Sequence, residues 1–400
     1  MKTIGIVAEY NPFHLGHEYH IRESRRLVGD DSSVIAVMSG DFVQRGEPAI
    51  LSKYARAEAA CRSGADLVIE LPLPWALSSA EGFARGSVTL LASLGAEVLS
   101  FGSETTDLDA LKQIAELVSE EEFTEEVVDL LKTRPNMSFA AARQLCAEQR
   151  IGKPLPMLQQ PNSILAVEYL KELRKNGLPM TPLAVRRRGA GHDERGAGEF
   201  PSAAELRSRI RTGAEIAGCV PDASKAVLGR ELAAGRVADN PDRLELLMLS
   251  RLRYLKEEDF NMLPEAGHGL GKRLFTAVRN ENSCEAIVAA AATRRYPRAR
   301  VQRLCVSACL GLRASDLQGL PPYARVLAFN EKGRTILRNA EEHSQIPLLT
   351  KPAHVSALDG SAQHVFRLGA DAHDFYTLLY QKEEERSCGA DWRTGPAVCL

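Results

Sequence analysis

The sequence has no apolar run that approaches the roughly twenty consecutive residues needed to cross a membrane. Its eight cysteines are scattered, with no C-x-x-C pair, and no apolar leader opens the chain. These absences argue against a membrane-spanning protein and against a disulfide-rich secreted one. We therefore expect a soluble, cytoplasmic protein whose thiols stay reduced.

An excess of charge of either sign is also missing, because 50 lysines and arginines nearly balance 52 acidic residues. A polyanionic partner would therefore have to meet a local basic patch. The 400 residues are too many for one compact core, so we expect at least two domains.

The most informative stretch covers residues 4–20 and reads IGIVAEYNPFHLGHEYH. Its apolar start predicts a buried strand, and Asn11-Pro12 then turns the chain out of the sheet. A helix beginning just after this turn would carry His14 and His17 on one face, beside backbone N–H groups without helical partners. Such groups bind phosphate, and imidazoles can donate to phosphate oxygens that gain charge as a phosphorus–oxygen bond breaks. We therefore predict a phosphate site with His14 and His17 as catalytic residues.

Two other interpretations of these histidines stand beside the phosphate site. In the first, the two histidines fall at a helix start by chance, and one ring packs in the core. Alternatively, His14, His17 and His20 bind a metal, although no acidic or cysteine ligand follows at a metal-like spacing. We favour the phosphate site and expect no metal held by protein ligands alone.

Up to about residue 190, short apolar runs alternate with helical periodicity. The expected strands cover residues 3–8, 33–38, 66–71, 97–101 and 182–186. The expected helices lie near residues 16–28, 52–63, 79–94, 107–118 and 161–175. This alternation predicts right-handed crossovers and a doubly wound parallel sheet, that is, a Rossmann-like α/β domain over residues 1–212.

In such a sheet, ligands collect beyond the carboxyl ends of the strands. Glu9 follows the first apolar run, Asp41 and Arg45 follow the second, and Gly102 follows the fourth. Each loop alone is explained by ordinary turn chemistry. Together, glycines that allow close approach, acids and an arginine predict a nucleotide site at this edge.

Two later helix starts add candidates. Asn162 opens one helix and either caps it or reads an adenine or ribose edge. Ser202 opens another, in which Arg207 follows just over a turn later, within reach of a phosphate at that N-terminus. A plain capping box formed by Ser202 and Glu205 explains the same residues.

Helical patterns dominate residues 213–380, which predicts a mainly helical second domain. Arginine clusters interleaved with tyrosine suit an RNA backbone, and an exposed helix with surplus charge is the alternative. Residues 381–400 show no clear periodicity and are expected to form a loose tail. Around Tyr296, five arginines fall within ten residues and are the candidate RNA-binding set: Arg294, Arg295, Arg298, Arg300 and Arg303.

Seven segments, taken in order, resemble the bacterial tRNA(Met) cytidine acetate ligases, a family of HxGH nucleotidyltransferases related to class I aminoacyl-tRNA synthetases. The similarity extends to about residue 375, and EYNPFH-x-GH together with SGDFVQRGEP is specific to that family. The segments are EYNPFHLGHEYH, MSGDFVQRGEPA, GADLVIELP, FGSE, QQPNSILAVEYL, GHDE and RVLAFNEKGR.

The resemblance implies an ATP-dependent ligase that activates acetate as acetyl-adenylate and releases diphosphate. The acetyl group then passes to N4 of the wobble cytidine in elongator tRNA(Met), giving N4-acetylcytidine and AMP. One of Arg186 and Arg187 is implied to bind ATP, and alignment back from His192 favours Arg186. The other implied ATP-binding residues are Val7, Ala8, Glu9, Tyr10, Asn11, Pro12, Phe13, His14, Leu15, Gly16, His17, Glu18, Tyr19, His20, Gly102 and Asn162.

Activation of acetate requires positioning and charge neutralisation at the α-phosphate, and no covalent protein nucleophile. We expect His14 and His17 to contact oxygens of the α- and β-phosphates. Arg207, assisted by Lys53 or Arg56 and by bridging Mg²⁺, is expected to contact the pyrophosphate.

For the acetyl transfer, Asp41 and Glu9 are both candidate bases. The chain departs from the family pattern at three positions, with Ala204 and Pro297 in place of threonines and Gly191 in place of an aromatic residue. Only Ala204 touches the chemistry. Two alternatives therefore remain, a catalytically inactive tRNA-binding protein and a small-molecule adenylyltransferase of the same superfamily.

Overall fold

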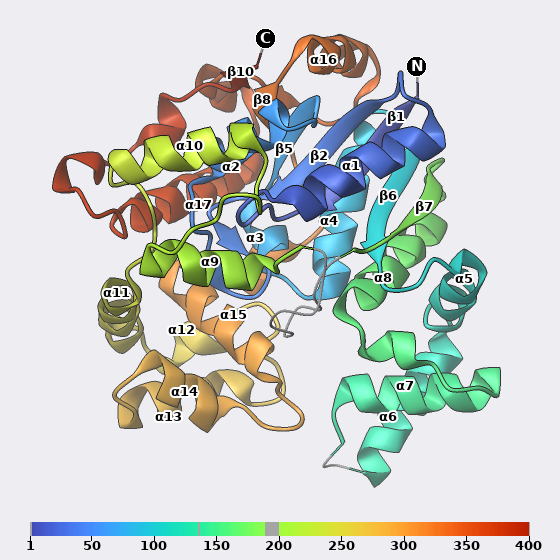
Figure 1. The fold of residues 1–400 in the computed structure, drawn as a ribbon. Coiled ribbons are helices and arrows are strands. Elements are labelled where there is room, and N and C mark those ends of the chain that lie inside the picture. Colours follow the sequence, from blue (N-terminus) through green and yellow to red (C-terminus); the bar gives the residue numbers. More distant parts are fainter. Residues whose placement is uncertain (1, 135–136, 189–199, 400) are drawn as a thin grey trace.

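The computed structural model describes residues 2–134, 137–188 and 200–399, and a twisted sheet with helices on both faces lies at its centre (Figure 1). The strands are apolar and rich in β-branched residues, as expected for a sheet covered on both sides. The sheet contains β1 (Thr3–Ala8), β2 (Ser33–Ser39), β5 (Leu67–Leu71), β6 (Val98–Ser103), β7 (Thr181–Arg186), β8 (Ala324–Phe329), β9 (Leu348–Leu349) and β10 (Ala397–Val398), and a separate hairpin pairs β3 (Phe42–Val43) with β4 (Glu47–Pro48).

The strand order is β10-β8-β5-β2-β1-β6-β7, with β9 paired to β8. Neighbours from β5 through β7 are parallel, whereas β8 runs antiparallel to β5. The order reverses at β1, because β2 and β5 lie on one side of it and β6 and β7 on the other. This confirms the predicted doubly wound α/β fold, whose switch point is where ligands bind in such sheets.

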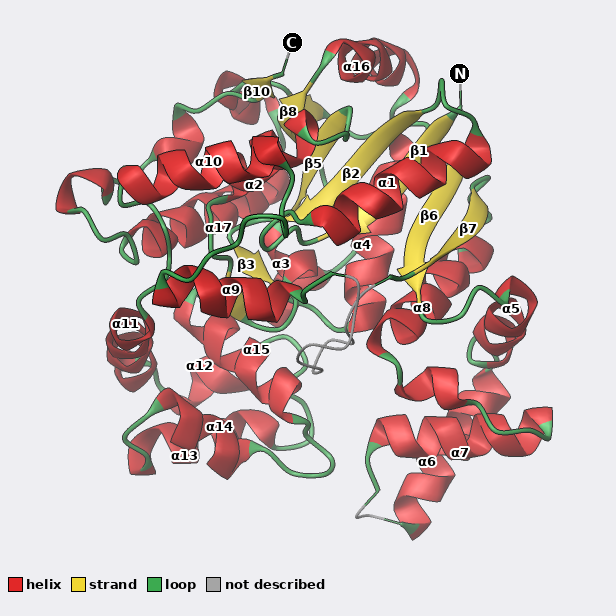
Figure 2. Cartoon of the chain, in the orientation of Figure 1, coloured by secondary structure: helices red, strands yellow, loops and turns green. Residues whose placement is uncertain are grey.

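Helices cover the sheet on both faces and form most of the remaining structure (Figure 2). The five helices expected in the first 190 residues correspond to α1, α2, α4, α5 and α8. In the part of the chain that the structure describes, the helices are α1 (Leu15–Val28), α2 (Lys53–Arg62), α3 (Leu73–Ala76), α4 (Ala80–Ser93), α5 (Leu108–Leu117), α6 (Glu121–Thr133), α7 (Phe139–Ile151), α8 (Pro161–Lys175), α9 (Ala203–Thr212), α10 (Asp222–Ala233), α11 (Pro241–Tyr254), α12 (Glu257–Asn261), α13 (Leu270–Asn280), α14 (Cys284–Ala291), α15 (Arg298–Cys309), α16 (Glu331–His343) and α17 (Gly360–Thr377), with 3₁₀ turns at Pro156–Gln159, Ala314–Leu317, Pro352–Ala357, Glu383–Glu385 and Ala390–Trp392.

Alternate residues of β2 belong to two different hydrophobic cores. Ile35 and Val37 pack with α4 and α8, while Val34 and Met38 pack on the opposite face with α1, α2 and α10. This division follows from the two-residue period of a strand. On β1, Gly5 leaves no room for a side chain, because a Cβ atom there would lie 2.8 Å from Leu91 of α4.

A third core joins helices α11, α13, α14 and α15, and α17 connects it to the sheet. On α17, Phe366 packs in the core of the sheet and Tyr376 in this helical core. The segment 213–380, expected to be mainly helical, also supplies β8 and β9 to the sheet.

The expected loose tail after residue 380 is wrong. Asp391 is fully buried, and β10 pairs with β8 in parallel. The segment is held by one buried carboxylate and a two-residue strand, neither of which produces periodicity in the sequence. Within the described residues, no helix is both long and apolar enough to cross a membrane.

Candidate active site

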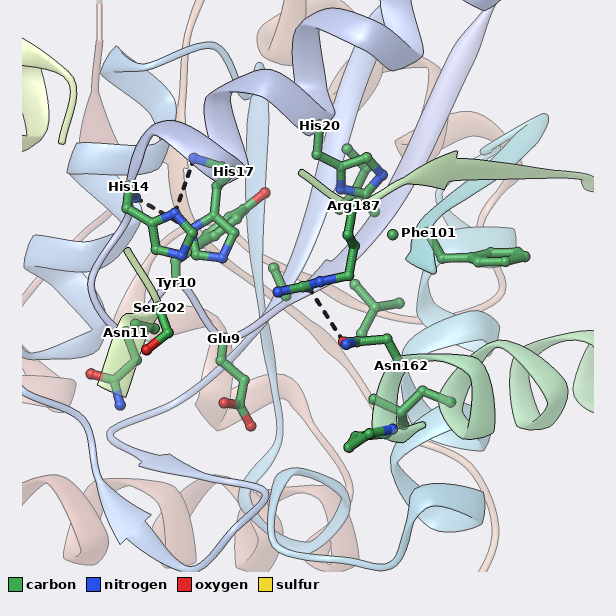
Figure 3. A pocket seen from close by; sticks show the side chains of 18 of the residues that line it. Glu9, Tyr10, Asn11, His14, His17, His20, Phe101, Asn162, Arg187 and Ser202 are labelled. Carbon is green, nitrogen blue, oxygen red and sulfur yellow. Dashed lines mark hydrogen bonds between the residues drawn. The ribbon is translucent and has the colours of Figure 1, made fainter. Parts of the chain in front are cut away.

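The turn after β1 places two histidines at the start of α1. Tyr10 has a φ of 47°, the Asn11-Pro12 peptide is cis, and α1 then begins at Leu15. His14 is the N-cap residue of this helix. Its imidazole stacks on that of His17 (Figure 3). The ring centroids are 3.8 Å apart and the ring planes are inclined by 26°.

Backbone hydrogen bonds fix where each of these imidazoles carries its proton. The N–H of Gly16 donates to Nδ1 of His14 over 3.0 Å, and the N–H of His14 donates to Nδ1 of His17 over 3.3 Å. A neutral imidazole that accepts at Nδ1 carries its hydrogen on Nε2. Both rings therefore hold a neutral Nε2–H group available to a ligand.

Burial keeps these rings uncharged. It lowers the pKa of His14 to about 3, with smaller contributions from Arg187 and Arg207. The pKa of His17 is held well below its usual value by burial and by the neighbouring His14. At neutral pH the pair therefore stabilises an anion by hydrogen bonding, without a positive charge of its own.

His20, one turn further along α1, differs from the pair because its Nε2 hydrogen is used within the protein. The Ser24 hydroxyl donates to the His20 carbonyl over 2.7 Å, so Ser24 accepts from Ser100, 2.7 Å away. Ser100 then has only acceptor capacity for His20 Nε2, at 2.9 Å. Burial lowers the pKa of His20 to about 4.

A second group of side chains faces the histidines from the ends of β6 and β7. Gly102 lies near the end of β6, and a Cβ atom there would lie 3.3 Å from Cγ of Arg187. Nη1 of Arg187 is 3.4 Å from Oδ1 of Asn162, in the first turn of α8 (Figure 3). Arg186 also lines the cavity, but it is the Arg187 guanidinium that reaches Asn162.

A third group comes from α9 and the β3–β4 hairpin. Ser202 is the N-cap of α9 and accepts from the N–H of Glu205 over 3.2 Å, and Arg207 donates to the carbonyl of Asn11 over 2.9 Å. Gln44 in the hairpin donates its N–H to Glu9 Oε1 over 3.0 Å. Burial raises the pKa of Glu9, although Gln44 and the nearby arginines oppose the shift.

These three groups surround one cavity of about 410 Å³ at the carboxyl ends of the parallel strands. The position is the one predicted from the strand order. The cavity is lined by the following residues of the predicted site: Val7, Ala8, Glu9, Tyr10, Asn11, His14, Gly16, His17, Tyr19, His20, Gly102, Asn162, Arg186, Arg187, Ser202 and Arg207.

Some predicted residues do not line the cavity. In the motif itself these are Pro12, Phe13, Leu15 and Glu18, which lie between residues that do. Ala204 follows the lining residue Ala203, and Gly191 lies outside the described residues.

Asp41, a predicted catalytic residue, also points elsewhere. Its carboxylate accepts from the N–H of Lys53 over 2.7 Å and contacts Nδ1 of His373 at 2.8 Å, in the protein interior. The expected pyrophosphate contacts from Lys53 and Arg56 are likewise not supported by the structure, because neither side chain lines the cavity. Arg56 donates to the backbone carbonyls of Glu9, Ser39, Gly40 and Leu51 and so holds the ends of β1 and β2 together.

Asp41 and Lys53 belong to a closed ion network that also contains Glu70, Arg325, His373 and Asp391. Lys53 Nζ is 2.9 Å from Glu70 and 2.6 Å from Asp391, and Arg325 Nη1 is 3.1 Å and 2.6 Å from the same two carboxylates. Burial alone would lower the pKa of His373, but the charge of Asp41 and the hydrogen bond to it raise that pKa.

The predicted RNA-binding arginines separate into two groups. Arg303 pairs with Glu265 at 3.2 Å, Arg300 donates to the carbonyl of the same residue, and Arg298 pairs with Glu285 at 2.6 Å. Arg294 and Arg295 are exposed. Tyr296 is buried and donates to the carbonyl of His268, so it is not available for stacking on a base.

Several cavity residues were missed by sequence reasoning. Leu165 and Tyr169 line the cavity on the same face of α8, and their four-residue spacing from Pro161 is the signal that points to them. Glu104, which sequence reasoning names only within the segment FGSE, does not line the cavity but accepts a hydrogen bond from Asn162 Nδ2 over 2.6 Å. Among the described residues, no group of three or more His, Cys, Asp or Glu side chains has a metal-binding arrangement.

Comparisons with known proteins agree with this geometry. The HIGH Nucleotidyl Transferase family profile matches residues 1–391. The tRNA(Met) cytidine acetate ligase of Acetivibrio thermocellus is 34% identical over 411 aligned residues, covering 98% of both chains. That of Syntrophotalea carbinolica is 40% identical over 367 residues, covering 89% of this chain and 86% of the relative.

Solved structures give the same result. The apo crystal structure of Thermotoga maritima TmcAL matches with a TM-score of 0.93 and 31% identity, covering 100% of this chain and 99% of that chain. TmcAL bound with alpha-thio ATP matches with a TM-score of 0.91 at the same identity and coverage. The chain therefore belongs to the HIGH nucleotidyltransferase family and, within it, to the tRNA(Met) cytidine acetate ligases.

Proposed function

We propose that this protein uses ATP to activate acetate as acetyl-adenylate and then acetylates N4 of the wobble cytidine of elongator tRNA(Met). The observation that carries the proposal is the pair of neutral Nε2–H donors on His14 and His17, inside a cavity of nucleotide size at the switch point of the sheet. The names of the relatives support the choice of substrates.

In the first step, a carboxylate oxygen of acetate attacks the α-phosphorus, and the bond to the departing pyrophosphate breaks. Charge increases on the phosphate oxygens as this happens, and His14 and His17 donate to them. We assign binding of the pyrophosphate to Arg207, which lines the cavity from the first half of α9. These groups act by position and by hydrogen bonding, and they need no proton exchange.

Magnesium fits this site in one respect, because Glu9 offers a carboxylate in the cavity and the triphosphate would supply the remaining oxygen ligands. Bound there, the ion would neutralise charge on the phosphates.

In the second step, the N4 amine attacks the carbonyl carbon of the anhydride, AMP departs, and the amine loses a proton. Of the two predicted bases, Glu9 lines the cavity and Asp41 does not, so Glu9 is the candidate proton acceptor. When no cation is bound to it, its raised pKa favours that role, since a more basic carboxylate takes up a proton more readily.

The cytidine must leave its stack to reach the cavity, which an anticodon loop allows. Arg186 and Arg188 are exposed and line the same cavity, so we place the phosphates of the loop against them. Arg294 and Arg295 are then available for a more distant part of the tRNA.

The deciding experiment incubates bulk tRNA with the protein, ATP and acetate, and analyses the nucleosides by mass spectrometry. We expect N4-acetylcytidine only when ATP and acetate are both present. A parallel assay measures acetate-dependent exchange of labelled pyrophosphate into ATP. Binding of tRNA without exchange would identify an inactive RNA-binding protein, and nucleotidyl transfer to a small molecule without tRNA binding would identify an adenylyltransferase.

A further inference from the structure

The side-chain amide of Asn162 is held in one orientation by groups on both sides. Its Nδ2 is 2.6 Å from Oε1 of Glu104, and its Oδ1 is 3.4 Å from Nη1 of Arg187. An ionised carboxylate can only accept hydrogen bonds, and a guanidinium can only donate them. The amide nitrogen must therefore face Glu104 and the amide oxygen must face Arg187.

Glu104 is itself anchored by the start of α8. Its Oε2 accepts from the Ser163 N–H over 2.9 Å and from the Ser163 hydroxyl over 2.7 Å. The Ser163 N–H belongs to the first turn of α8, where backbone donors lack helical partners. Burial alone would raise the pKa of Glu104, but the hydrogen bonds from Asn162 and Ser163 lower it and keep the carboxylate ionised.

Glu104 does not line the cavity, whereas Asn162 does. Any effect of Glu104 on a ligand must therefore pass through Asn162. After its contacts with Glu104 and Arg187, the Asn162 amide still has one N–H and one oxygen lone pair. It thus offers the cavity a donor and an acceptor side by side, in an order that Glu104 and Arg187 set together.

An adjacent donor and acceptor on an asparagine match the N6 amine and N7 of adenine. Guanine carries an acceptor, O6, where adenine has the N6 donor, so it would place an acceptor against Oδ1. The surrounding wall is apolar and suits a purine ring, since it includes Phe101, Ile164 and Leu165.

We propose that Glu104 is a positioning residue, which orients the Asn162 amide so that the cavity accepts adenine and rejects guanine. The inference rests on the proposed use of ATP and adds the selection of its base. In a Glu104→Gln protein the new side-chain amide can donate to Asn162 Oδ1. Only the longer contact with Arg187 then opposes rotation of the Asn162 amide, and rotation exchanges the donor and the acceptor offered to the base.

The test measures equilibrium binding of ATP and of GTP to the full-length protein by calorimetry. We expect the wild type to prefer ATP, and we expect Glu104→Gln to narrow the ATP:GTP preference on the order of 10-fold, the worth of one good bidentate contact. The control is Glu148→Gln. Glu148 also accepts from an amide side chain, Gln144, and from a backbone N–H, that of Leu155, but it lies outside the cavity lining. The ATP:GTP preference of the Glu148→Gln protein should equal that of the wild type.

Asn162→Ala provides a second measurement that does not depend on the folding of the first variant, and it should narrow the preference by a similar factor. An unchanged ATP:GTP ratio in Glu104→Gln, or equal weakening of both nucleotides in Asn162→Ala, would overturn the proposal and place these residues at the ribose. A wild type that prefers ATP but forms no N4-acetylcytidine would contradict the proposed function and leave the base selection intact. A wild type that binds neither nucleotide would overturn both.

Discussion

Two clusters of polar side chains lie at the same edge of the sheet, and they differ in whether their hydrogen-bonding groups are used. In the ion network, Lys53 and Arg325 each contact Glu70 and Asp391 directly. In the cavity, His14 and His17 use Nδ1 for backbone N–H groups and keep Nε2 for a ligand. Burial alone therefore does not distinguish a structural cluster from a functional one, whereas an unused donor that faces a cavity does.

The comparison is tested most strongly by Lys53→Met. Removing the buried cation leaves Glu70 and Asp391 with only Arg325, so we expect a loss of about 3–5 kcal/mol in the free energy of unfolding, measured by urea denaturation. Lys132→Met is the matched control, because its pair with Asp129 is exposed, and we expect no measurable change. A loss as small as in the control would show that the network is not structural.

His17→Ala should have the opposite effect to Lys53→Met, since it should lower activity and leave stability nearly unchanged. We expect the rate of acetyl-adenylate formation to fall on the order of 100-fold to 1,000-fold, as when one donor to a developing oxyanion is removed. The unfolding midpoint should change little. His343→Ala, an exposed histidine at the end of α16, serves as the control. A normal activation rate in His17→Ala would remove the central argument for the site.

The two clusters should also respond to pH in opposite directions. The folded-state pKa of His14 is lowered to about 3, so its contribution to stability is present above pH 6.5 and is lost as the pH falls below that value. Between pH 6.5 and 5 the wild type should lose about 1.6 kcal/mol through this residue, at 1.36 kcal/mol per pKa unit and with the unfolded histidine half protonated at pH 6.5. His14→Gln should lack this loss, which urea unfolding at several pH values measures.

For His373 the folded-state pKa is raised, so its contribution is fully present below the unfolded pKa and is lost as the pH rises through the folded value. His373→Gln should therefore be more destabilised, relative to the wild type, at pH 6 than at pH 8. The same slope for both variants would contradict the division into an open and a closed cluster.

The smallest expected effects concern RNA binding. Arg188→Ala, at the cavity, should weaken tRNA binding uniformly and reduce the salt dependence by about one unit of slope. Arg298→Ala should weaken tRNA binding less than Arg188→Ala does, because Arg298 is already paired with Glu285. Filter binding at several salt concentrations measures the tRNA affinity and its salt dependence for both variants. An equal effect of the two substitutions would indicate that the arginines around Tyr296 are the main RNA contact.

The sequence predicted that a ligand cavity lies at the carboxyl ends of the parallel strands, and the structure has its cavity there. This was possible because apolar runs and helical periodicity are local signals. Sequence reasoning placed His14, His17, Gly102 and Asn162 in a nucleotide site, and the structure brings all four to one cavity. It could not tell that Glu9 lines the cavity and Asp41 does not, because both residues follow strands of the same sheet. The partner that withdraws Asp41 from the cavity is His373, 332 residues away in the chain, and a contact between such distant residues leaves no local pattern.

The arginine-rich segment shows the same difficulty from the other direction. Its density of positive charge is visible in the sequence, but the neutralising residues, Glu265 and Glu285, are not its neighbours in the chain. The positions of the histidine protons were equally out of reach, since they follow from which backbone N–H group meets each Nδ1 atom.

The contact between Lys53 and Asp391 has a consequence for biosynthesis. The two residues are 338 positions apart, so a ribosome must translate nearly the whole sequence before the ammonium near the beginning meets its carboxylate. Until then the nascent sheet holds a buried cation without this counter-ion, which disfavours the finished packing. A product truncated before Asp391 should consequently be a substrate for chaperones and proteases, even though it contains every residue of the nucleotide cavity.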